Sequence, residues 1–243
     1  MRYLSLILLS AGVAYAGGSM EFYGGGATSL IYDSTGKSTT PQLASSTYGV
    51  KVKYSIFSTP IPVSPRANAV MDLKFISVDT ASARVLNLLL EGKVPFITLR
   101  AGVNLDMASG SSRFFDGHNA LLMGASIGIP FVNASLDYAY TLPENGVDVG
   151  DVLIFRTGGG IKFGLGEFAY VKAGLDVIYR KIYSPVGGYN LSILPYASAK
   201  FTSIAVDLIL GFEDEYGYYG LSLAGNNTPA TGLGTQIRLK YYF

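Results

Sequence analysis

Residues 233–243 read LGTQIRLKYYF, and they carry the strongest indication of the fold. Its side chains alternate between two chemically different faces. One face holds Leu233, Thr235, Ile237, Leu239, Tyr241 and Phe243. The other holds Gly234, Gln236, Arg238, Lys240 and Tyr242. Because successive side chains of a β-strand point to opposite sides, this period of two predicts a strand with one apolar and one polar face.

The same alternation runs through most of the chain after residue 16. It predicts an all-β fold of about twelve strands, at residues 19–33, 45–58, 66–78, 82–90, 96–107, 119–129, 131–142, 151–163, 167–182, 189–200, 203–213 and 232–243. Ten or fourteen strands are also possible. The weakest assignments are residues 82–90, which could form a short helix, and residues 214–231, which could contain further strands. No linker or block of charge divides residues 17–243, so we expect a single domain there.

The composition favours strands over helices as the way to place apolar surface. Mean hydropathy is +0.33, and only 14% of the residues are charged. No stretch after residue 16 approaches the ~18 continuous apolar residues of a transmembrane helix. The 30 glycines, 18 tyrosines and 13 phenylalanines instead indicate β-structure with belts of aromatic rings.

Every second expected connection is short, and the others are mostly longer and more polar. The short ones are Thr59 to Pro65, Glu91 to Pro95, the turn near Pro130, Gly164 to Glu167 and the turn near Thr202. The longer ones are Ser34 to Ala44, Ala108 to His118, Pro143 to Gly150, Ser184 to Gly188 and Asp214 to Thr231. Short turns at one end and long loops at the other are typical of an antiparallel up-and-down transmembrane barrel with an even number of strands.

Alternation by itself leaves open which face is outside. A secreted soluble barrel or β-sandwich would bury the apolar face and expose the charged one. Two features favour the inverted arrangement of a transmembrane barrel. Several expected strands reach the ~9–11 residues that a tilted transmembrane strand needs. Aromatic rings, which suit the membrane–water interface, recur near strand ends at Tyr32, Tyr48, Phe57, Tyr138, Tyr140, Phe168, Tyr179 and Tyr183.

The last strand, which ends on Phe243, resembles the C-terminal signature of bacterial outer-membrane β-barrel proteins of the porin-like kind. The resemblance extends over Gly17 to Phe243 and names no subfamily. It implies that the barrel-assembly machinery recognises this strand through Leu239, Tyr241 and Phe243, and that lipid and lipopolysaccharide of the outer membrane surround the protein. The chain departs from the pattern in having no Trp, so Tyr and Phe alone would form its aromatic belts.

The first sixteen residues have the layout of a secretory signal peptide. Arg2 supplies the positive charge, residues 3–13 are almost entirely apolar, and Ala14-Tyr15-Ala16 forms an A-x-A cleavage site. We therefore expect residues 1–16 to be removed during export. The mature barrel, residues 17–243, would cross the periplasm of a Gram-negative bacterium to the outer membrane.

An apolar exterior would leave the charged face to line the barrel interior. Parity places eleven cations there: Lys51, Lys53, Lys74, Arg100, Arg156, Lys162, Lys172, Arg180, Lys200, Arg238 and Lys240. The inward acids are Asp72, Asp137, Asp176 and Asp207, with Asp106 and Glu213 near the rims. Because fixed lumen charge selects permeant ions, this excess predicts a porin-like passive channel favouring small anions or acidic solutes. The alternative is a structural or surface-interaction barrel whose lumen is plugged by pairing among these charges.

Other classes of function find little support in the sequence. A formal net charge of +1 gives no argument for nucleic acid, and the absence of Cys excludes thiolate chemistry. The only His, His118, lies near Ser111, Ser112 and Asp116, which makes a barrel hydrolase a distant third alternative. The glycine clusters fit no phosphate-loop pattern, and no ligand spacing indicates a metal. We expect no enzyme, no cofactor and no metal.

Overall fold

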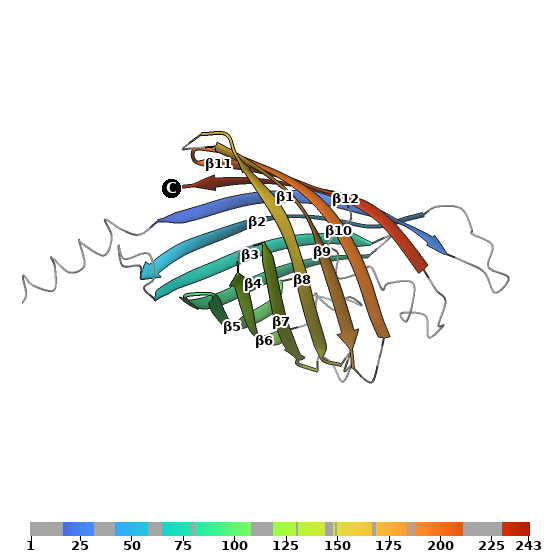
Figure 1. Ribbon diagram of the computed structural model, residues 1–243. Coiled ribbons are helices and arrows are strands. Elements are labelled where there is room, and N and C mark those ends of the chain that lie inside the picture. Colours follow the sequence, from blue (N-terminus) through green and yellow to red (C-terminus); the bar gives the residue numbers. More distant parts are fainter. Residues whose placement is uncertain are drawn as a thin grey trace, which may run out of the picture.

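The computed structural model describes residues 17–31, 42–57, 65–78, 81–107, 119–129, 131–143, 148, 150–166, 169–183, 185, 188–210 and 230–243. These form twelve strands (Figure 1): β1 (Gly18–Ile31), β2 (Gln42–Phe57), β3 (Arg66–Val78), β4 (Ala81–Val94), β5 (Ile97–Asp106), β6 (Ala120–Ile129), β7 (Val132–Thr141), β8 (Val152–Gly164), β9 (Ala169–Ile182), β10 (Gly188–Phe201), β11 (Ile204–Leu210) and β12 (Ala230–Tyr242). In this part of the chain there is no helix long and apolar enough to cross a membrane.

The twelve strands form one closed antiparallel barrel in which each strand pairs with its neighbours in sequence. The sheet closes where β1 pairs with β12, from Ser19 opposite Tyr242 to Ile31 opposite Ala230. Figure 1 shows the C-terminus at the end of the barrel where β1 begins. Closure gives the backbone donors and acceptors of β1 and β12 partners within the sheet, which a barrel in hydrocarbon requires. The prediction of an all-β barrel with twelve strands is confirmed.

The segment at 82–90, which also fitted a short helix, is a strand and is longer than predicted. β4 continues to Val94 and pairs with β3 through Arg66 opposite Lys93. The run Glu91-Gly92-Lys93 looks like a turn in the sequence. In the barrel, however, Glu91 reaches the Nζ atom of Lys53 on β2 across the inner wall. Lys53, which is distant in sequence, compensates the charge of Glu91, so the strand can continue through this residue.

The turns at one end of the barrel are tight. β4 and β5 are joined by Pro95 and Phe96 alone, and β10 and β11 by Thr202 and Ser203. Phe96 has φ of 67°, a region that non-glycine residues seldom occupy. We call this end, where Gly17 and Phe243 also lie, the short-turn end. The opposite end, where β1 continues toward β2 and β5 toward β6, is the long-loop end.

The outer face of the barrel is apolar and the inner face is polar. Leu99 and Leu136 are 60% and 49% exposed on the outside, whereas Asp72 and Arg180 are only 8% and 4% exposed. A soluble barrel would have the opposite distribution. Aromatic side chains exposed at the short-turn end are Tyr54, Phe57, Phe96, Phe131, Phe163, Phe201, Tyr241 and Phe243. The exterior is therefore suited to hydrocarbon flanked by an aromatic belt.

Candidate functional site

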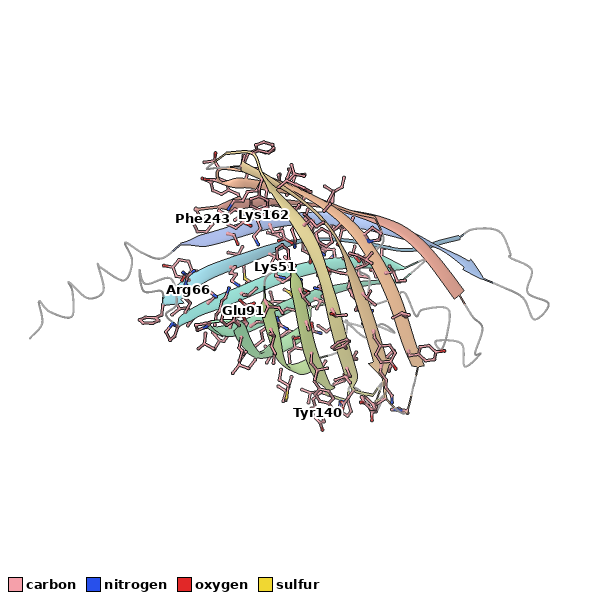
Figure 2. The ribbon with its side chains drawn as sticks, viewed as in Figure 1. Lys51, Arg66, Glu91, Tyr140, Lys162 and Phe243 are labelled. Carbon is pink, nitrogen blue, oxygen red and sulfur yellow. The ribbon has the colours of Figure 1, made fainter. Side chains whose placement is uncertain are left out.

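The barrel encloses a cavity of about 370 Å³ whose lining comes from ten of the twelve strands, β1 to β9 and β12. Six cationic side chains line it: Lys51, Lys74, Arg100, Arg156, Arg180 and Arg238. Four acidic side chains also line it: Glu21, Asp72, Glu91 and Asp137. Six cations against four anions leave an excess of two positive charges. Figure 2 shows Lys51 near the middle of the barrel.

The fifteen charged residues assigned to the interior by parity fall into three groups. The cavity lining holds Lys51, Asp72, Lys74, Arg100, Asp137, Arg156, Arg180 and Arg238. Strand positions with the same inward parity, but outside that lining, hold Lys53, Lys162, Lys172, Asp176, Lys200 and Lys240. The side chain of Asp207 lies outside the described part of the structure, although its backbone pairs with Ser198 and Arg238.

Two acidic residues of the cavity were missed in the sequence. Glu21 precedes a run of glycines, and Glu91 lies beyond the predicted end of its strand. In the barrel Glu21 lies 3.7 Å from the Nζ atom of Lys240, and Glu91 contacts Lys53. Both glutamates lie at every second position along their strands, on the same face as other inward residues. Continuing the period-two alternation through residues 21 and 91 would therefore have identified them.

Inward glycines let neighbouring side chains lie flat on the wall. Gly124 of β6 lies in register between Arg100 of β5 and Asp137 of β7. The Arg100 Nε and Nη2 atoms donate to the two carboxylate oxygens of Asp137, each at 3.0 Å. A Cβ atom at Gly124 would overlap the Asp137 carboxylate. The missing side chain therefore makes room for a bidentate ion pair between strands that are not adjacent.

A similar arrangement lies on β1 to β3. The Tyr23 ring covers Gly49, which is its partner in register on β2. Its hydroxyl donates to Oδ1 of Asp72 on β3 at 2.7 Å. Like the pair formed by Arg100 and Asp137, this contact joins strands two apart. Such contacts run along the wall, so these side chains line the cavity without crossing it.

Part of the interior is apolar. Ile178 of β9 and Leu194 of β10 are buried, and Ile154 and Tyr196 pack against them. The Tyr196 ring lies over Gly174, its partner in register, and its hydroxyl is close to Gly160 on β8. Two small residues thus accommodate one large ring on the inner wall of β8 to β10.

Four inward lysines lie near the short-turn end, and tyrosine rings hold their ammonium groups. Lys162 lies 4.0 Å from the centroid of Tyr170, and Lys172 lies 4.9 Å from that of Tyr196. Lys200 and Lys240 both lie over Tyr242, at 4.2 and 5.2 Å. We call these seven residues the lysine–tyrosine wall: Lys162, Lys172, Lys200, Lys240, Tyr170, Tyr196 and Tyr242.

The interior offers no metal site within the described residues, where no three His, Asp or Glu side chains cluster suitably. His118, Ser111, Ser112 and Asp116, on which the hydrolase alternative depends, lie outside the described part of the chain. Residues 1–16, the expected signal peptide, also lie outside it. These expectations stay predictions.

No family model matches this chain, and no curated protein matches its sequence. Among solved structures it is similar to the NanC porin, with 12% identity over 91% of this chain and 98% of that one, at a TM-score of 0.42. The translocator domain of the autotransporter NalP from Neisseria meningitidis has 12% identity over 100% and 95% of the two chains, at a TM-score of 0.46. OmpT of Vibrio cholerae has 11% identity over 93% of this chain and 98% of that one, at a TM-score of 0.33.

These similarities are too low to transfer any function to this chain. The fold assignment rests on the closed sheet, the even number of strands and the apolar exterior. Together these are the features of a bacterial outer-membrane β-barrel, so the resemblance of the last strand to that class agrees with the structure.

Proposed function

We propose that this protein resides in a bacterial outer membrane and forms a passive channel for small anions or acidic solutes. The observation that supports the proposal is the charge of the cavity, where six cations outnumber four acids. In a low-dielectric wall, fixed charges of one sign raise the local concentration of counter-ions. Anions would therefore enter the barrel more readily than cations of similar size.

The pairing pattern supports a lumen that stays accessible. Arg100 with Asp137, and Lys53 with Glu91, join strands two apart on the same wall. Opposite walls of a closed twelve-stranded barrel are about six strands apart, so these pairs neutralise charge without spanning the interior. A barrel of this size lies between those filled by side chains and those with a wide channel.

Conductance of the purified full-length mature barrel in a planar bilayer tests the proposal. In a tenfold KCl gradient we expect discrete current steps and a reversal potential of the sign set by chloride, below the limit of about 59 mV for a univalent ion. The double variant R156Q/R238Q should move the reversal potential towards zero, because both arginines line the cavity. K181Q, which changes an exposed lysine on β9 outside the cavity lining, is the matched control.

A structural barrel with a plugged lumen is the second candidate. It is favoured by the apolar packing of Ile178, Leu194, Ile154 and Tyr196 inside the barrel. Folded protein that inserts but gives no current steps would support this candidate and reject the channel. A reversal potential of the sign set by potassium would reject the anion preference.

A further inference from the structure

The lysine–tyrosine wall lies apart from the cavity lining. Lys162, Lys172, Lys200 and Lys240 occupy inward positions near the short-turn ends of β8, β9, β10 and β12, and none belongs to the cavity lining. Figure 2 shows Lys162 near the end of the barrel that carries Phe243. The channel proposal does not by itself explain why four lysines gather here.

Two of these lysines are direct partners in register. Lys162 of β8 lies opposite Lys172 of β9. Side chains at directly opposite positions have Cβ atoms about 4.5–5.5 Å apart, and like charges there destabilise a sheet. No carboxylate pairs with either lysine among the described residues. A folded barrel that keeps this pair therefore places two positive charges close together, with neither ammonium group ion-paired to a carboxylate of the described residues.

The other two lysines share one aromatic ring. Lys200 and Lys240 lie 4.2 and 5.2 Å from the centroid of Tyr242. Ala205 of β11 is the partner in register of both, so a small residue separates them on the wall. Glu21, 3.7 Å from Lys240, is the one acid ion-paired with a lysine of the wall among the described residues. Among the described side chains, these four cations and one anion leave an excess of three positive charges.

The tyrosines position these ammonium groups without neutralising them. A cation over an aromatic face gains electrostatic energy from the ring, yet its full charge stays available to a ligand. Tyr196 is itself fixed, because it lies over Gly174 and packs against Ile178 and Leu194. The packed Tyr196 ring therefore holds Lys172 at a defined place on the inner wall.

We propose that the lysine–tyrosine wall binds a multiply charged oxyanion, such as the phosphate group of a solute. The inference rests on the proposed function, because the solute reaches the wall through the lumen. An anion with two or more charged oxygens can accept hydrogen bonds from both lysines of a pair, which a single chloride ion does less well. Lysine is a common phosphate ligand because its ammonium acts as a compact point charge with three donors.

Calorimetric titration of the folded full-length mature barrel, in a non-ionic detergent at low ionic strength, tests this site. The probe is pyrophosphate, and sodium acetate is the singly charged comparison. We expect pyrophosphate to bind at least tenfold more tightly than acetate. The double variant K162Q/K172Q should lose at least tenfold in pyrophosphate affinity, whereas K162R/K172R, which keeps both charges, should retain it.

Lys181 provides the matched control. It also lies over a tyrosine, 5.0 Å from the Tyr183 centroid, but it is exposed at the long-loop end of β9. K181Q should leave pyrophosphate binding unchanged. If the double glutamine variant does not fold, K172Q alone removes one charge of the opposed pair and should still weaken binding.

The two proposals fail in different ways. Anion-selective current without pyrophosphate binding would reject the wall as an oxyanion site and leave the channel standing. Binding that is lost in K162Q/K172Q, from a barrel that gives no current, would support the wall and reject the channel. Equal affinity for acetate and pyrophosphate, or equal losses in K181Q and K162Q/K172Q, would overturn the assignment of the wall.

Discussion

Arg100 of β5 and Asp137 of β7 form a bidentate ion pair over Gly124 of the strand between them, with both donor–acceptor distances at 3.0 Å. The pair connects two strands that share no backbone hydrogen bonds. It also places a cation and an anion of the cavity in contact, so it affects both the stability of the wall and the charge of the interior.

Removing either partner should therefore weaken the barrel modestly. We expect R100Q and D137N each to lower the free energy of unfolding by about 1 kcal/mol, since both side chains are partly exposed in the cavity. Urea titration of the folded barrel in lipid vesicles measures this. In the double variant R100Q/D137N the two losses should not add. Strict additivity would show that the two side chains do not interact.

Substituting Gly174 should disturb the Tyr196 ring. A Cβ atom there would overlap the Gly159 carbonyl oxygen and the Tyr196 ring, so G174A should cost roughly 1–3 kcal/mol. Gly164 on β8 has no atom within 4 Å of such a Cβ, and G164A should stay within about 0.5 kcal/mol of the parent. The same urea titration compares the two variants. Equal effects would contradict the role given to the space over Gly174.

The absence of Trp from the chain allows a direct test of which face meets lipid. Leu136 and Ser135 are neighbours on β7, and Leu136 is on the exposed outer face whereas Ser135 lines the cavity. Trp fluorescence of L136W should be strongly quenched by lipids with brominated acyl chains. That of S135W should be quenched by aqueous iodide instead. The reverse pattern would mean that the faces are assigned the wrong way round.

The last residue should matter for assembly in the cell more than for the finished fold. Phe243 is exposed on the outer face, and its backbone pairs with Gly18 through N–H···O contacts of 2.7 and 3.1 Å. We expect F243A to reduce the amount of folded barrel in the outer membrane, while purified F243A still refolds in detergent. F201A, another exposed aromatic at this end, is the control. Equal losses for both variants would argue against an assembly signal in the last strand.

Much of the architecture could be predicted because it depends on local pattern. Period-two alternation located all twelve strands, and parity put Lys51, Asp72, Arg100 and Arg180 on the wall that surrounds the cavity. The end of β4 was placed four residues early, since Glu91 and Lys93 resemble a turn until Lys53 of β2 is seen opposite. Strand ends depend on partners that the local pattern does not contain.

Neighbouring residues alone are enough to establish that this chain forms two-faced strands, with apolar side chains on one side and most of the charge on the other. Strand alternation is a property of neighbouring residues, so it can be read without knowing the fold. Closure of the sheet between β1 and β12, with the apolar face outward, is established by the folded barrel, because it depends on pairing between the two ends of the chain. Only register, which relates residues far apart in the chain, could bring Arg100 to Asp137 over Gly124 and Lys162 beside Lys172.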